Sequence, residues 1–303
     1  MKIYDLKTMQ LCGITENTVV ALGTFDGCHK GHLSVFASCA SLARQMKAKS
    51  VVYTFSSIPM TKSARCIFSL DEKIRLIKKF GIDYICIEDF ENVSSLDGNG
   101  FFENILRGAL KAQGAVCGFN FKFGNGGAFG AEDLKNMFEN VGGCVQICEK
   151  TAFENEVLSS TLLRKFIENG DIEKLVHLAS PYSIYAKVKE GKHLGRTIGV
   201  PTINQSIPKD KVIPKRGVYI TECEIGEDVY PSITNVGVRP TTDPYGSEQN
   251  IETHIIGFDK ELYGSFIRVN FYKFLRDERK FPSLDELKAQ IQKDIEASKS
   301  YFF

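Results

Sequence analysis

The chain has 303 residues, of which 43% are hydrophobic and 25% are charged, and its formal net charge is +1. This length allows two domains of ordinary size, and the composition is typical of a globular protein in water. The charge excludes a general attraction to nucleic acid or to an anionic membrane, and no apolar run is long enough to span a bilayer. The N-terminus lacks the pattern of a signal peptide, and nine scattered cysteines without a CxxC pair favour reduced thiols over disulfides or zinc. We therefore expect a cytoplasmic protein that binds neither nucleic acid nor membrane.

The first half of the chain alternates expected strands with expected helices. Strands are expected at 18–22, 50–55, 83–87, 115–118 and 144–148, and helices at about 31–46, 70–80, 101–113 and 132–140. Ser69 and Glu72 form a capping-box pattern before the second of these helices. The alternation predicts an α/β fold with a parallel sheet covered on both faces, in which ligands bind at the carboxyl ends of the strands.

The loop between the first buried strand and its helix has the features of a phosphate site. Its glycines let backbone amides approach an anion, and the helix N-terminus adds partial positive charge. His29 and His32 lie at this helix mouth, where imidazoles can donate hydrogen bonds to phosphate oxygens as charge builds at the α-phosphorus. We assign phosphate contacts to Gly23, Thr24, Phe25, Asp26, Gly27 and Gly31. The alternative is a loop whose histidines only cap the helix.

Two later segments add polar groups at the same edge of the sheet. Residues 118–130 combine five glycines with Phe121 and Phe123, whose rings can stack, and with Asn120, which can bond a base or a ribose. At 158–164, a serine caps a helix, and Ser160 and Thr161 at its start stand one turn before Arg164. This arrangement predicts a second phosphate clamp.

The character of the sequence changes after residue 182, so we expect domains at 1–182 and 183–303. Short segments separated by turn signals predict an antiparallel barrel or sandwich, and a capping box at Ser283 begins a final amphipathic helix. Near residue 200, Thr202 and Asn204 present a hydroxyl and an amide oxygen from one loop. Such hard oxygen ligands suit Mg²⁺.

These motifs carry a family resemblance. The run His29-Lys30-Gly31-His32 resembles the HxGH signature of nucleotidyltransferases, and its surroundings are similar to bacterial bifunctional riboflavin kinase/FMN adenylyltransferases (FAD synthetases). Segments 118–124 and 159–164 resemble the GxNFxFG and SSTxxR elements of those enzymes. Residues 195–204 resemble the GRxxGxPTxN motif of riboflavin kinases, and the similarity continues over 183–298. The resemblance implies a Rossmann-like nucleotidyltransferase domain and a C-terminal antiparallel β-barrel kinase domain that ends in a helix.

The resemblance also implies substrates and roles. Riboflavin is phosphorylated with ATP to FMN, and FMN is adenylylated to FAD with release of pyrophosphate and with Mg²⁺ as the cofactor. Glu252 matches the general base of the kinase, which takes the proton of the ribityl hydroxyl, while His29, His32 and Arg164 serve adenylyl transfer. The resemblance also assigns phosphate contacts to Gly195 and Arg196 and metal ligation to Thr202 and Asn204. The residues expected to contact the flavin are Asn120, Phe121, Phe123 and Arg276.

Three positions depart from the family pattern and leave alternatives open. Ser56 and Ile58 stand where an acidic residue and a histidine are usual, and Gly257 stands where an aspartate is usual. One alternative is a riboflavin kinase with a weakened adenylyltransferase domain. Another is a non-catalytic flavin or nucleotide sensor, against which the retained Glu252 argues. A nucleotidyltransferase acting on tRNA is disfavoured by the near-neutral charge and by the kinase-like second half.

Overall fold

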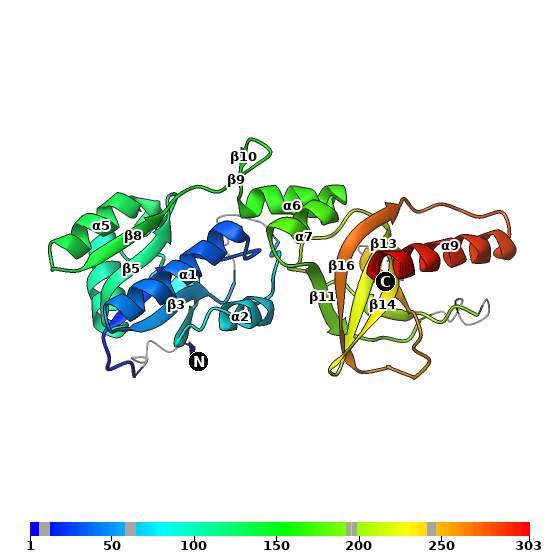
Figure 1. Ribbon diagram of the computed structural model, residues 1–303, viewed down its shortest axis with the longest axis horizontal. Helices are drawn as coiled ribbons and strands as arrows, with labels where there is room; N and C mark the ends of the chain where they lie inside the picture. Colours follow the sequence, from blue (N-terminus) through cyan, green and yellow to red (C-terminus); the bar gives the residue numbers. More distant parts are fainter. Residues whose placement is uncertain (6–12, 58–64, 192–194, 196–198, 241–246) are drawn as a thin grey trace. The chain divides into compact units, whose positions relative to one another are not determined.

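The computed structural model describes residues 1–5, 13–57, 65–191, 195, 199–240 and 247–303 (Figure 1). The chain divides into two compact units, Met1–Leu162 and Leu163–Phe303. This division falls inside one helix, whereas the sequence pattern places the change of character after residue 182. In the part of the chain that the structure describes, no helix combines the length and apolar character that crossing a bilayer requires.

A six-stranded sheet forms the centre of the N-terminal unit, and every neighbouring pair in it is parallel. The strand order is β1-β4-β3-β2-β5-β8, so the chain runs outward from β2 first to one side and then to the other. Ligands bind at the carboxyl ends of strands where the order reverses in this way. The strands are β1 (Lys2–Asp5), β2 (Thr18–Leu22), β3 (Lys49–Phe55), β4 (Tyr84–Glu88), β5 (Ala112–Gly118) and β8 (Cys144–Cys148).

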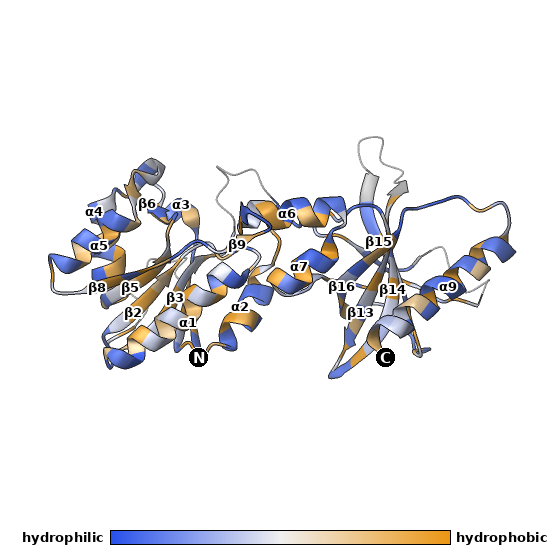
Figure 2. Ribbon diagram, turned by 45° about the horizontal axis from the view of Figure 1, so that its top comes forward, coloured by the Kyte–Doolittle hydropathy of each residue, from blue (hydrophilic) through white to orange (hydrophobic). Residues whose placement is uncertain are grey.

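Helices cover both faces of this sheet, as the sequence predicts. On one face, α1 (Lys30–Gln45) buries Val35, Phe36 and Cys39. On the other face, η2 (Phe101–Ala109) and α5 (Ala131–Glu139) pack hydrophobic side chains against β2, β3 and β5, whose hydrophobic residues are seen in Figure 2. The unit also contains α2 (Leu70–Lys78), α3 (Phe90–Val93), α4 (Gly98–Gly100), η3 (Asn125–Gly127) and the short strand pairs β6 (Lys122–Phe123) with β7 (Phe129–Gly130) and β9 (Ala152–Phe153) with β10 (Glu156–Val157).

One expected helix differs from its prediction. The sequence pattern extends a helix over 101–113, but η2 is a π-helix that ends at Ala109, and β5 begins at Ala112. The amide of Leu110 donates to the carbonyl of Ile105, five residues back, at 2.9 Å, and Lys111 then takes a positive φ of 52°. The helix thus ends on this wider turn, and the left-handed Lys111 leads the chain directly into β5.

The C-terminal unit is an antiparallel six-stranded sheet in the order β11-β16-β13-β14-β15-β12. The side chain of Gln205 in β12 donates to the carbonyls of Ala186 at 2.7 Å and Ile267 at 2.8 Å, which joins the two edges and closes the sheet into a near-complete barrel rather than a sandwich. Its elements are α6 (Ser160–Asn169), α7 (Ile172–Leu178), β11 (Tyr182–Lys187), β12 (Ile203–Ser206), β13 (Gly217–Ile225), β14 (Asp228–Pro240), β15 (Ser247–Ile255), β16 (Phe266–Arg276) and α9 (Leu284–Phe302).

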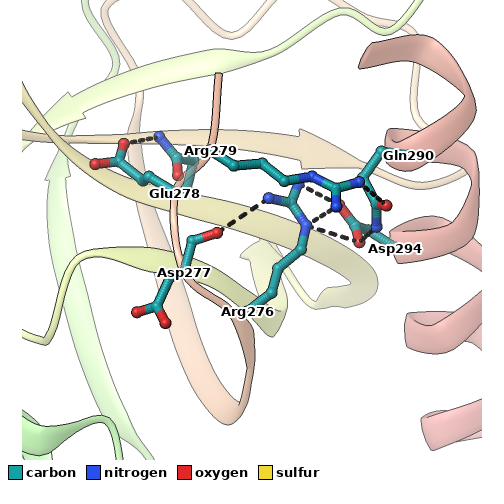
Figure 3. A network of polar contacts seen from close by, with 7 residues as sticks. Arg276, Asp277, Glu278, Arg279, Gln290 and Asp294 are labelled. Carbon is teal, nitrogen blue, oxygen red and sulfur yellow. Dashed lines mark hydrogen bonds and ion pairs between the residues drawn. The ribbon is translucent and has the colours of Figure 1, made fainter. Parts of the chain in front are cut away.

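An ion pair anchors the final helix to the barrel (Figure 3). The guanidinium of Arg276, at the end of β16, donates to both carboxylate oxygens of Asp294 in α9, with the shortest contact at 2.7 Å. The Asp294 side chain is only 5% exposed, so its charge depends on this partner and on Gln290, which donates at 2.8 Å. Loss of one partner from a buried ion pair leaves an uncompensated charge.

We expect Asp294→Ala to destabilise the C-terminal unit by about 3 kcal/mol, because it leaves the Arg276 guanidinium partly buried without its carboxylate. The matched control is Glu296→Ala on the same helix, which removes an exposed ion pair with Lys299 and should cost well under ~1 kcal/mol. Urea unfolding followed by circular dichroism measures both. Equal losses in the two variants would contradict the anchoring role of Asp294.

Candidate active sites

The loop from β2 to α1 is shaped by three residues with left-handed backbone conformations. Phe25, Gly27 and Cys28 have φ values of 52°, 78° and 37°. The side chains of Phe25 and Cys28 point into the protein and are 2% and 0% exposed. The two side chains therefore support the loop from inside, and burial raises the pKa of the Cys28 thiol to about 12, which keeps it protonated.

Asp26 fixes the position of this loop with both its side chain and its backbone. Its buried carboxylate accepts hydrogen bonds from the backbone amides of Ile67 at 2.9 Å and Phe68 at 3.2 Å. Its carbonyl accepts a bond of 2.7 Å from the hydroxyl of Ser160 at the start of α6. The sequence assigns Asp26 and Ser160 to phosphate binding, and the structure places them together, where they anchor the loop between β2 and α1.

His29 and His32 form a stacked pair at the mouth of α1. Their ring centroids lie 3.7 Å apart with an interplanar angle of 20°, and the edge of Phe25 packs against His32. Gly31 makes room for this arrangement, since a Cβ there would come within 3.2 Å of the His29 ring. The buried Nδ1 atoms of both rings have no hydrogen-bond partner among the described residues. The pair thus offers unsatisfied polar atoms at a helix N-terminus.

Burial keeps both imidazoles uncharged. Desolvation lowers the pKa of His29 to about 4. Desolvation also lowers the pKa of His32 well below its usual value, with smaller contributions from the nearby charges of His29 and Lys73. At neutral pH the two rings are therefore neutral groups, each able to donate one hydrogen bond.

Lys73 is a charged residue at this site that the sequence interpretation missed. Its side chain is 3% exposed, and its Nζ donates to the carbonyl of Phe55 at 2.9 Å and to that of Thr24 at 3.4 Å. Burial lowers the pKa of Lys73, and the Asp26 carboxylate opposes that shift. A sequence signal existed, because Lys73 lies four residues before the buried Ile77 on the inward side of α2.

Residues 159–164, which the sequence predicts to be a second phosphate clamp, lie at the start of α6. Ser159 caps α6, because its hydroxyl accepts from the amide of Leu162 at 3.3 Å. Thr161 is exposed on the first turn, and Arg164 stands one turn later in the same helix, counted with the C-terminal unit.

After β5, Asn120 is exposed, and the Phe121 ring stacks on Phe123 at 5.7 Å. Phe123 belongs to the hydrophobic core. Of the two rings that the sequence assigns to flavin, only Phe121 therefore lies near the surface.

In the barrel, the strand register brings together residues that the sequence assigns to metal binding and to proton transfer. Asn204 on β12 and Asn235 on β14 both lie directly opposite Glu252 on β15. Side chains of such cross-strand pairs project from the same face of a sheet, within contact distance. Glu252 is exposed, whereas Asn204 is buried and its Oδ1 accepts from the side chain of Asn250 at 3.3 Å.

The loop before β12 places Thr202 two residues before Asn204 and at the edge of a cavity. Gly195 approaches closely, because a Cβ there would lie 3.3 Å from the Thr202 hydroxyl and 2.3 Å from the Val200 carbonyl. Nδ1 of His254 bonds the Pro201 carbonyl at 2.8 Å. The adjacent cavity of about 430 Å³ has a mixed lining, in which Ile203, Ile255, Phe258 and Leu262 stand beside the charged residues Asp259, Lys260 and Glu261. This volume lies in the range of small-molecule sites.

Three assignments from the sequence need separate comment. Arg196 and Ile58 lie outside the described residues. Arg276 holds Asp294 and the carbonyl of Asp277, so its guanidinium already has protein partners in this structure (Figure 3). Asn235 donates to Glu278 at 3.0 Å, a contact next to the Asn204–Glu252 pair that the sequence did not indicate.

Comparison with known proteins gives matches over both units. A family model described as FAD synthetase matches residues 13–162, and one described as riboflavin kinase matches residues 178–302. The crystal structure titled as a macrolide-efflux protein from Streptococcus pneumoniae has 32% sequence identity and a TM-score of 0.89, and the match covers 98% of each chain.

Curated relatives cover nearly the whole chain. The bifunctional riboflavin kinase/FMN adenylyltransferase of Bacillus subtilis (strain 168) is 34% identical over 94% of this chain and 92% of its own length. The protein of the same description from Haemophilus influenzae is 31% identical over 95% of this chain and 96% of its own length. The chain therefore belongs to the bifunctional riboflavin kinase/FMN adenylyltransferase family.

Proposed function

We propose that this chain makes both flavin cofactors. Its C-terminal unit phosphorylates riboflavin with ATP to give FMN, and its N-terminal unit joins FMN to the AMP part of a second ATP to give FAD and pyrophosphate. The observation that carries the proposal is the pairing of Asn204 with Glu252 in one unit and the stacked neutral histidines in the other. Since both reactions consume ATP, we place the enzyme in the cytoplasm.

In the kinase reaction, the Glu252 carboxylate takes the proton of the ribityl hydroxyl as that oxygen attacks the γ-phosphorus and ADP leaves. Glu252 suits this role because it is exposed and so open to a substrate. The cavity beside Thr202, which has both apolar and charged lining residues, is suited to part of ATP, with Phe258 available for stacking on the adenine.

Thr202 and Asn204 fit Mg²⁺, because one hydroxyl and one amide oxygen leave most of its coordination sites to water and phosphate. When bound there, the ion supplies charge neutralisation for the phosphates. The remaining lone pair of the Asn204 amide oxygen is consistent with such a ligand, since Asn250 occupies only one of the two.

In adenylyl transfer, an FMN phosphate oxygen attacks the α-phosphorus of ATP, and the bond to the pyrophosphate oxygen breaks. The backbone amides at the start of α1 and the two imidazoles donate to the phosphate oxygens as their charge increases. Arg164 and Thr161 add donors for the terminal phosphates, and Asn120 and Phe121 contact the flavin. Ser56, at the departure from the family pattern, bonds the carboxylate of Asp89, so an acidic group stands beside this position.

We expect Glu252→Gln to reduce riboflavin phosphorylation at least about 100-fold, because the amide cannot accept the hydroxyl proton. Adenylylation of added FMN should stay within about twofold, since the second site is unaffected. Chromatographic analysis of the products measures both rates. Glu227→Gln, in the exposed turn between β13 and β14, is the control. Full kinase activity in Glu252→Gln would reject this residue as the base.

We expect His32→Ala to stop the reaction at FMN, with a loss of about 100-fold or more in FAD formation, because a donor to the reacting phosphate is removed. The unchanged kinase rate of the same variant serves as the internal control. Mixing His32→Ala with Glu252→Gln should restore FAD formation from riboflavin. A His32→Ala variant that makes FAD at the normal rate would favour another adenylyl site.

The lowered pKa of His29 predicts a pH-dependent stability. Unfolded His29 takes up a proton below about pH 6.5, whereas the folded protein does so only near pH 4. Stability should therefore fall as the pH falls between these values, by about 3 kcal/mol for this group in full. Urea unfolding of His29→Gln should give a shallower pH dependence than the natural protein. Identical slopes would show that His29 has an ordinary pKa.

A further inference from the structure

Lys73 is buried beside the adenylyl site, where it bonds two backbone carbonyls rather than a side chain that the proposed reaction uses. It lies in α2, and its side chain is as buried as that of Asp26, at 3% exposure each. Removing an ammonium group from water costs several kcal/mol unless it is well compensated. A methionine of similar length would fill the same volume without that cost, so packing alone does not account for the charge.

The partners of Lys73 indicate what the charge does. Its Nζ donates to the carbonyl of Thr24, two residues after the end of β2, and to that of Phe55, the last residue of β3. The hydroxyl of Thr54 donates to the same Thr24 carbonyl at 3.0 Å. Two donors from different elements therefore turn this carbonyl inward, away from the position that an anion would occupy.

The same group also brings positive charge to the phosphate loop. Lys73 interacts electrostatically with Asp26, in the middle of the loop, and with His32, in the first turn of α1. Because the region is buried, such an interaction is screened less than it would be at the surface. A fixed cation at this position favours a polyphosphate bound to the adjacent amides.

We infer that Lys73, together with Thr54, is a positioning residue that sets the phosphate loop of the N-terminal unit for a polyphosphate. Lys73 acts through the Thr24 carbonyl and through its fixed charge, and it does not contact the ligand. The inference rests on the proposed adenylyl transfer for its role in catalysis, but its test uses binding of inorganic pyrophosphate, which needs no reaction.

The test compares Lys73→Met, Lys73→Arg and Lys78→Met in the full chain. Lys78 lies in the same helix and is exposed, so its variant controls for the loss of one positive charge from α2. Isothermal titration calorimetry with pyrophosphate should show at least tenfold weaker binding for Lys73→Met, partial recovery for Lys73→Arg and no change for Lys78→Met. Lys73→Met should also raise the KM for ATP in FAD formation more than it lowers kcat, with kinase activity unchanged.

A folded Lys73→Met variant that binds pyrophosphate as well as the natural protein would overturn the inference, as would a natural protein that binds no pyrophosphate. If Lys73→Met does not fold, the same pyrophosphate titration of Thr54→Val and Thr54→Ser tests the inference. Weaker binding by Thr54→Val but not by Thr54→Ser supports the inference, and equal binding by both overturns it. A natural protein that binds pyrophosphate in a Lys73-dependent way but forms no FAD would refute adenylyl transfer and leave the positioning role intact.

Discussion

The hydrogen bonds of Asp26 hold the N-terminal site together. Its carboxylate accepts two backbone amides from the segment before α2, and its carbonyl accepts the hydroxyl that opens α6. The partners of these bonds are distant in sequence, so the single residue Asp26 connects the loop between β2 and α1 to residues 67–68 and to the start of α6. Phe25 and Cys28 can keep their strained left-handed conformations because these hydrogen bonds, together with the burial of both side chains, fix the backbone of the loop.

With the loop fixed, the two sites meet their anionic substrates differently. The N-terminal site presents neutral imidazoles and backbone amides, and its cation, Lys73, stays behind the loop. Donors that are already in place need no rearrangement as the phosphate charge increases. The barrel instead presents a carboxylate beside amide oxygens, which suits proton removal and a divalent cation. Each arrangement fits the step proposed for it, because adenylyl transfer from ATP to the FMN phosphate requires no base, whereas phosphorylation of a hydroxyl does.

Much of this could be predicted from the sequence. The hydrophobic periodicity and the capping motifs predicted the helices and strands of the first domain. The family motifs singled out Asn204 and Glu252, and the strand register of the barrel sets these two residues opposite each other. Local patterns do not report long-range partners. Motif spacing therefore could not indicate that Asp26 accepts from residues 67 and 68, or that Arg276 pairs with Asp294, 18 residues later in α9. Lys73 was missed because a lysine in an amphipathic helix is usually solvated.

The central claim is that one chain breaks two different bonds of ATP at two sites. The most direct measurement follows the products formed from riboflavin and Mg²⁺ with ATP labelled at either the γ- or the α-phosphorus. The account predicts that the γ label enters FMN first and then FAD, while the α label enters only FAD as pyrophosphate is released. An α label that never reaches a flavin would contradict adenylyl transfer, and a γ label absent from FMN would contradict the kinase.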